Sequence, residues 1–163
     1  MGSGISGLYS GAIPTGLFAG SIDYMTPGDP FSEGIKKRRD IDTNGFYDLI
    51  AHGTSKTMLI EHNGTQVEIS HRALARLLKN DSRITGKSIR LLSCNTGRIP
   101  KGFALGLADR LGVTVKAPTD YLWTDENGRY FVAAGKKVND KLVPILSKPG
   151  KFKTYKPHRR KKK

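Results

Sequence analysis

Short apolar runs that end at turn-forming or reactive residues recur along the middle of the chain. Residues 46–51 (FYDLIA) run directly into His52-Gly53, and residues 88–93 (SIRLLS) run directly into Cys94. Runs of this length, rich in Ile, Leu and aromatic residues, are typical of strands buried on both faces of a sheet. The pattern therefore predicts two buried strands, each with a chemically useful side chain just beyond its carboxyl end.

Two amphipathic stretches predict helices between the strands. Residues 71–80 (HRALARLLKN) carry leucines at helical spacing and follow Ser70, whose hydroxyl can cap a first turn. Residues 101–111 (KGFALGLADRL) have the same periodicity and stop at Gly112, a residue suited to a left-handed helix end. A third strand is expected over residues 113–117. The order strand, helix, strand, helix, strand predicts an α/β fold with a mostly parallel sheet flanked by helices.

Two further segments predict accessory β-hairpins. Residues 57–62 and 65–70 flank an Asn-Gly pair, which suits the positive φ angles of a tight hairpin turn. Residues 121–124 and 129–134 flank the turn sequence DENG, and they read as a closing hairpin.

Composition divides the chain into three regions. Residues 1–45 hold nine of the 19 glycines, which predicts turns and loops, so the ordered core is expected over residues 46–147. Residues 136–163 carry twelve lysines and arginines against Asp140 alone, which accounts for +11 of the net charge of +14. Residues 148–163 contain no acidic residue and few apolar ones, so a disordered basic tail is expected there, binding polyanions weakly.

Several classes of protein are excluded by composition. No apolar stretch approaches the roughly 20 residues of a membrane span, so no membrane-spanning segment is expected. A single cysteine can form neither an internal disulfide nor a thiolate zinc site, and no cluster of ligands at metal-binding spacing is present. No nucleotide-binding glycine motif follows a strand, so we expect neither a metal nor a nucleotide cofactor.

The two strand ends predict a catalytic dyad. Ligands bind beyond the carboxyl ends of parallel strands, where both His52 and Cys94 are expected, and imidazole is suited to exchange a proton with a thiol. The amides of Gly53 and Cys94 could stabilise an oxyanion. Asp48 alternates with His52 along the strand and either orients the imidazole or is simply a solvated carboxylate. The competing interpretation of a lone Cys94 is an inert buried thiol, whereas Ser93 should point away from the site.

The two blocks FYDLIAHG and SIRLLSC carry a family resemblance. Their order and spacing resemble the clan of cysteine peptidases that includes caspases, gingipains, legumain and the autoprocessing domains of bacterial toxins, over residues 46–124. The resemblance implies a caspase-like fold and a cysteine endopeptidase in which His52 and Cys94 form the dyad and Gly53 is the oxyanion glycine. It also implies that the wall of a specificity pocket comes from residues 120–123. Asp120 and Trp123 are the candidates there, although Trp123 could instead pack within its hairpin.

A second resemblance concerns the biological setting. The stretch RLLSCNTGRIPKGFALGLADRLGVTVKAPTDYLW is similar to C-terminal modules of polymorphic bacterial toxins of the Rhs and contact-dependent types. This similarity implies an effector secreted as part of a larger toxin and acting in the target-cell cytoplasm on a target protein or on its own carrier. It also implies a cognate immunity protein as a partner. Activation by inositol phosphate or another polyanion is an expectation from the autoprocessing domains, with no other cofactor.

Two other functions compete with the peptidase. The basic terminal segment would suit a toxin domain that targets nucleic acid, but such a domain needs acidic metal ligands or a second catalytic histidine near the basic surface. A binding module that keeps the fold without activity is the third interpretation, because a fold does not imply a function. Selective modification of Cys94 by an electrophilic peptide would separate the peptidase from both.

Overall fold

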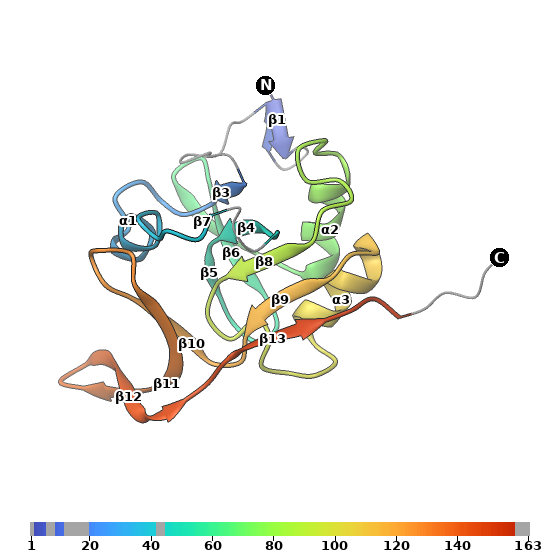
Figure 1. The fold of residues 1–163 in the computed structure, drawn as a ribbon. Helices are drawn as coiled ribbons and strands as arrows, with labels where there is room; N and C mark the ends of the chain where they lie inside the picture. The colour runs from blue at the N-terminus through green and yellow to red at the C-terminus, as the bar shows by residue number, and fades with distance from the viewer. Residues whose placement is uncertain (1, 6–8, 12–19, 42–44, 159–163) are drawn as a thin grey trace.

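A five-stranded sheet with the order β13-β9-β8-β4-β3 forms the centre of the computed structural model, which describes residues 2–5, 9–11, 20–41 and 45–158 (Figure 1). Within this sheet β3, β4, β8 and β9 are parallel to one another, and β13 is antiparallel to its neighbour β9. Their bounds are β3 (Ser21–Asp23), β4 (Tyr47–Ile50), β8 (Ile89–Leu92), β9 (Val115–Pro118) and β13 (Phe152–Tyr155). The expected α/β class with a largely parallel sheet is confirmed at this level.

Both faces of the sheet are buried, as the continuous apolar runs predict. Leu49 and Leu91 point into one core, which α2 (His71–Lys79) and α3 (Phe103–Leu111) cover. Ile50 and Leu92, their neighbours along the same strands, point into a second core shared with α1 (Pro30–Ile35) and the strands that follow β9. Because side chains alternate along a strand, Asp48, two positions before Ile50 on β4, lies on the same face as Ile50.

Local capping and turn residues act as the sequence predicts. The Ser70 hydroxyl accepts a hydrogen bond from the Ala73 amide at 3.2 Å, which starts α2. Gly112 ends α3 with a φ of 69°, a conformation that costs glycine little. The Asn63-Gly64 turn has positive φ at both residues, 52° and 80°, as a tight hairpin requires.

Within the described residues, three smaller sheets accompany the main one. One contains β5 (His52–Gly53), β6 (Met58–His62) and β7 (Thr65–Ile69), and another contains β10 (Tyr121–Thr124), β11 (Tyr130–Val138) and β12 (Lys141–Pro149). The third pairs β1 (Gly2–Ile5) with β2 (Tyr9–Gly11). The two predicted hairpins are confirmed, and the second one continues into β12, so that a long β-ribbon extends from the body of the protein (Figure 1).

The predicted division into three regions is wrong at both ends. Residues 20–41, expected as loops, supply β3 and α1. Residues 148–158, expected as a disordered tail, supply the end of β12 and the sheet strand β13, in which Tyr155 is 5% exposed and its hydroxyl donates to the Gly97 carbonyl at 2.6 Å. The lysines of this segment remain exposed while its backbone pairs with β9. The high charge therefore indicated exposed side chains, but it did not indicate a disordered backbone. Residues 159–163 lie outside the described part.

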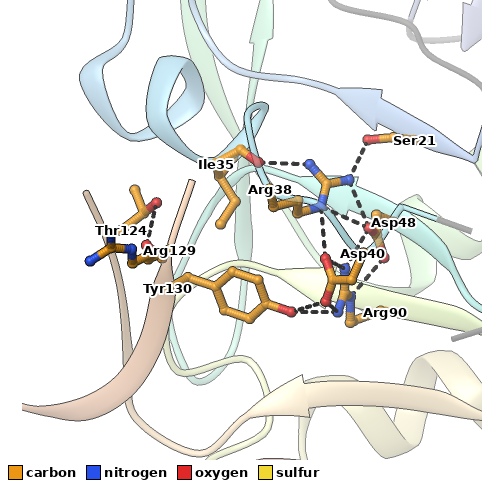
Figure 2. A network of polar contacts seen from close by, with 9 residues as sticks. All are labelled: Ser21, Ile35, Arg38, Asp40, Asp48, Arg90, Thr124, Arg129 and Tyr130. Carbon is orange, nitrogen blue, oxygen red and sulfur yellow. Dashed lines mark hydrogen bonds and ion pairs between the residues drawn. The ribbon is translucent and has the colours of Figure 1, made fainter. Parts of the chain in front are cut away.

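A buried polar network ties the N-terminal region to the sheet (Figure 2). Asp48 on β4 accepts hydrogen bonds from Arg38 and from Arg90 on β8, with the shortest contacts at 2.7 Å, and all three side chains are buried. Arg90 also donates to Asp40 and to the hydroxyl of Tyr130. Burial, together with the hydrogen bond to Asp40, raises the pKa of Tyr130 to about 12, so the phenol stays protonated. The network therefore joins β4 and β8 to α1's flanking loop and to β11.

Candidate active site

A cavity of about 580 Å³ opens where β4 and β8 end, and both His52 and Cys94 line it. The side chains around it come from α1, β5, β6, β10 and β12, elements that are far apart along the chain. The lining residues are Pro30, Phe31, Ala51, His52, Gly53, Leu59, Cys94, Tyr121, Leu122, Trp123, Thr124 and Leu142. The two residues expected to form a dyad therefore share one cavity at the carboxyl ends of adjacent parallel strands.

An aspartate that the sequence analysis did not single out orients His52. The imidazole Nε2 lies 2.7 Å from Asp29 Oδ2. The other carboxylate oxygen of Asp29 accepts hydrogen bonds from the amides of Phe31 and Ser32, at 2.9 and 3.3 Å, and thereby caps α1. One carboxylate thus holds the start of a helix with one oxygen and the ring of His52 with the other.

Asp48, which the sequence predicts as the residue that orients His52, is not its partner, because Asp29 takes that position. Asp48 lies within β4 of the central sheet, whereas His52 begins β5 in a separate sheet and its Nε2 pairs with Asp29. Asp48 is instead fully buried between Arg38 and Arg90. The expected orienting role is therefore wrong, and so is the alternative of a solvated carboxylate. The Asp-Pro-Phe sequence at Asp29 could have indicated a helix start, but not its contact with His52.

The thiol of Cys94 lies against the backbone of β10. The Leu122 amide donates to Sγ at 3.3 Å, and the thiol donates to the Leu122 carbonyl at 3.7 Å. Burial raises the pKa of Cys94 above that of an ordinary cysteine, and the nearby charge of Asp120 acts in the same direction. The thiol therefore rests in its neutral form and needs a base to become a nucleophile.

The pH dependence of Cys94 alkylation should reflect the raised pKa of the thiol. Iodoacetamide reacts with the thiolate, so the midpoint of its rate against pH is expected at a higher pH in the folded protein than in the same protein unfolded in guanidinium chloride. The midpoint is the quantity to compare, because restricted access slows the rate at every pH without moving it. Mass spectrometry of timed samples measures the rate. A lower midpoint in the folded protein would mean that a thiolate is stabilised at rest.

Close packing around Gly53 leaves no room for a side chain. A Cβ built on Gly53 would lie 2.8 Å from Thr96 Cγ2 and 2.9 Å from the Cys94 carbonyl oxygen. The absent side chain thus lets β5 approach the loop that carries Cys94. A larger residue at this position would push His52 and Cys94 apart.

The two candidates for the pocket wall differ in position. Trp123 lines the cavity while its indole Nε1 donates to the Ala133 carbonyl at 3.0 Å, so it belongs to both the hairpin and the cavity. Asp120 is not among the lining residues. Its carbonyl accepts from the Asn95 amide at 2.9 Å, and its carboxylate accepts from the Tyr121 amide at 3.0 Å. Asp120 therefore fastens the Cys94 loop to the start of β10.

Several apolar lining residues were not predicted from the sequence, and Phe31, Leu59 and Leu142 are among them. Phe31 comes from α1 and lies beside His52, with 6.3 Å between ring centroids, while Leu59 comes from β6 and Leu142 from β12. Nothing in their local sequence distinguishes them from ordinary apolar positions. Only the folding of separate elements around the strand ends brings them together.

Other kinds of site find little support in the described ranges. Within them, no three His, Cys, Asp or Glu side chains are grouped so that they could hold a metal ion. None of the helices found there has the length and apolar character needed to cross a membrane.

Comparison with known proteins gives one match. A family model described as "Domain of unknown function (DUF8616)" matches residues 20–132, a range that contains Asp29, His52 and Cys94 and stops within β11. No curated protein and no solved structure matches the chain significantly.

Proposed function

The chain belongs to the DUF8616 family, whose function is unknown, and we propose that it is a cysteine endopeptidase with Cys94 as nucleophile and His52 as acid and base. The observation that carries the proposal is the cavity itself: a thiol and a carboxylate-bound imidazole line it together, beyond the ends of adjacent parallel strands. The resemblance of the His-Gly and Ser-Cys blocks to caspase-like peptidases supports the same roles. A caspase-like arrangement of the sheet is part of this proposal.

In the first step, His52 takes the proton of the thiol. Asp29 binds Nε2, so Nδ1 is the nitrogen that accepts this proton as Sγ attacks the substrate carbonyl and the carbon–sulfur bond forms. The carboxylate of Asp29 stabilises the imidazolium that results. A buried, neutral thiol makes this base necessary, because Cys94 does not supply a thiolate by itself.

In the second step, the tetrahedral intermediate collapses. Its oxyanion accepts hydrogen bonds from the amides of Gly53 and Cys94, and the carbon–nitrogen bond breaks as His52 returns its proton to the leaving amine. Water then attacks the thioester, His52 takes the proton of that water, and the carboxylic acid leaves as Cys94 regains its thiol. Each proton that His52 accepts is thus returned within one turnover.

The biological setting is proposed from resemblance alone. The similarity to polymorphic toxin modules suggests an effector that acts in a target cell on a protein substrate. An immunity protein made by the producing cell would then have to cover the cavity that holds Cys94. The exposed lysines of the C-terminal segment would favour acidic partners through weak electrostatic attraction.

An electrophilic peptide probe tests the proposal directly. A peptidyl acyloxymethyl ketone should add once to the intact chain, at Cys94, and the adduct should be lost in His52→Ala because no base then activates the thiol. His158→Ala is a matched control, since His158 also pairs with an aspartate, Asp109, at 2.9 Å but lies outside the cavity. Intact mass and peptide mapping give the result. A folded parent protein that stays unmodified would favour a binding module without activity.

A further inference from the structure

We propose that the cavity accepts a large apolar side chain, such as leucine or phenylalanine, from the residue immediately before the scissile bond, and that Leu142 forms one wall of this pocket. This inference rests on the peptidase function proposed above. It assigns a substrate class to the cavity and a specificity role to the β11–β12 ribbon.

The chemistry of the walls sets the preference. Phe31, Leu59, Leu122 and Trp123 present apolar surface to the cavity, and its volume of about 580 Å³ is ample for a large side chain. Burying a leucine or phenylalanine side chain against such surface is favourable because it removes apolar area from water. Apolar substrates therefore gain binding energy here that a small residue cannot.

Charged side chains find no counter-ion in the same place. Among the described residues that line the cavity there is no lysine, arginine, aspartate or glutamate. Asp120, which would favour a basic side chain, is not among them, and the carboxylate of Asp29 is already bound to His52 and to the first turn of α1. A charged side chain would lose hydration on entry without gaining an ion pair.

The position of Cys94 identifies which substrate residue enters. The backbone of Leu122 on β10 contacts Sγ, whereas His52, which must protonate the leaving amine, is held by Asp29 at the cap of α1. The residue before the scissile bond remains attached to Sγ as the acyl group. The Cβ atom of its side chain is three bonds from the sulfur, so the side chain begins beside the cavity that Cys94 lines.

Leu142 is an apolar residue that a bound substrate would cover. It follows the turn at the end of the β11–β12 ribbon, where Asn139 and Asp140 have φ angles of 52° and 65°, and it is 41% exposed although it lines the cavity. Leu146, on the same strand, is 73% exposed and is not a lining residue. The ribbon thus brings one of its exposed leucines to the site and leaves the other in solvent.

A set of peptides tests the substrate class. Acetyl-Ala-Ala-Xaa-aminomethylcoumarin substrates vary only the residue before the cleaved bond, with Leu, Phe, Lys or Asp as Xaa. We expect kcat/KM for Leu or Phe to exceed that for Lys and Asp by at least about tenfold, the size of effect that apolar pockets give. Equal or faster cleavage after Lys or Asp, dependent on Cys94, would overturn the inference and leave the peptidase function standing.

A pair of variants tests the role of Leu142. Leu142→Glu places a carboxylate at the wall, so the ratio of kcat/KM for the Leu and Lys substrates should fall by at least about tenfold. Leu146→Glu makes the same change on the same strand outside the cavity, and its ratio should match the parent. Ratios within one preparation cancel differences in the amount of active protein. An unchanged ratio in Leu142→Glu, or the same change in both variants, would remove Leu142 from the pocket.

The two levels of the proposal fail differently. If no peptide is cleaved and the electrophilic probe leaves Cys94 unmodified, the peptidase function is wrong and the specificity falls with it. If cleavage depends on Cys94 but does not discriminate among the peptides, only the apolar pocket is wrong.

Discussion

Peptide hydrolysis should fall by about 1000-fold or more when Cys94 is replaced by alanine, while the protein stays folded. In the proposed mechanism the thiol forms the covalent bond to the substrate, and Cys94 is the one cysteine of the sequence. Cys94→Ser should lose most of the rate as well, because a hydroxyl does not form an anion as easily as a thiol. Steady-state kcat/KM on the Leu peptide measures the loss, and circular dichroism establishes the fold.

His52→Ala should lose a comparable amount, and the double variant should lose little more than the worse single one. In the proposed mechanism the two side chains act in the same steps, so their effects should not be additive. Asp29→Asn should cost less than either, because Asp29 orients the imidazole and does not touch the substrate. His158→Ala should retain the parent rate. Additive losses in the double variant, or a folded Cys94→Ala protein with parent activity, would contradict the dyad.

The largest effect on stability is expected at Asp48, with Asp48→Asn lowering the free energy of unfolding by about 3–5 kcal/mol. Its carboxylate lies between the guanidinium groups of Arg38 and Arg90, and all three side chains are buried (Figure 2). Removing the negative charge leaves two buried positive charges with less compensation, and the new amide N–H group competes with donors instead of accepting from them. Urea unfolding followed by circular dichroism gives the change.

A surface ion pair serves as the control for Asp48. Glu33 contacts Lys36 at 3.4 Å, but the Glu33 side chain is 56% exposed, so Glu33→Gln should cost less than about 1 kcal/mol. If Asp48→Asn changes the free energy of unfolding by less than about 1 kcal/mol, and the slope of that free energy against urea concentration is unaltered, the network contributes little to stability.

Most of the parallel sheet could be predicted because its signals are local. The apolar runs that form β4 and β8 must be buried on both faces, and this requirement is visible in consecutive residues. Ser70 and Gly112 mark helix ends through their own side chain and backbone preferences. The ends of the sheet were not predictable in this way, since β3 and β13 are short edge strands whose pairing partners are remote in sequence.

Local apolar runs predict that His52 and Cys94 each follow a buried strand, and the parallel pairing of β4 with β8 then places them at one edge of the sheet. The residues that surround these two side chains depend on how separate elements pack together. Asp29 and not Asp48 holds the imidazole, and Leu142 reaches the cavity from β12. Hydrophobic periodicity and caps report the environment of residues a few positions apart, whereas contacts between separate elements depend on how those elements pack, which no short stretch of sequence encodes.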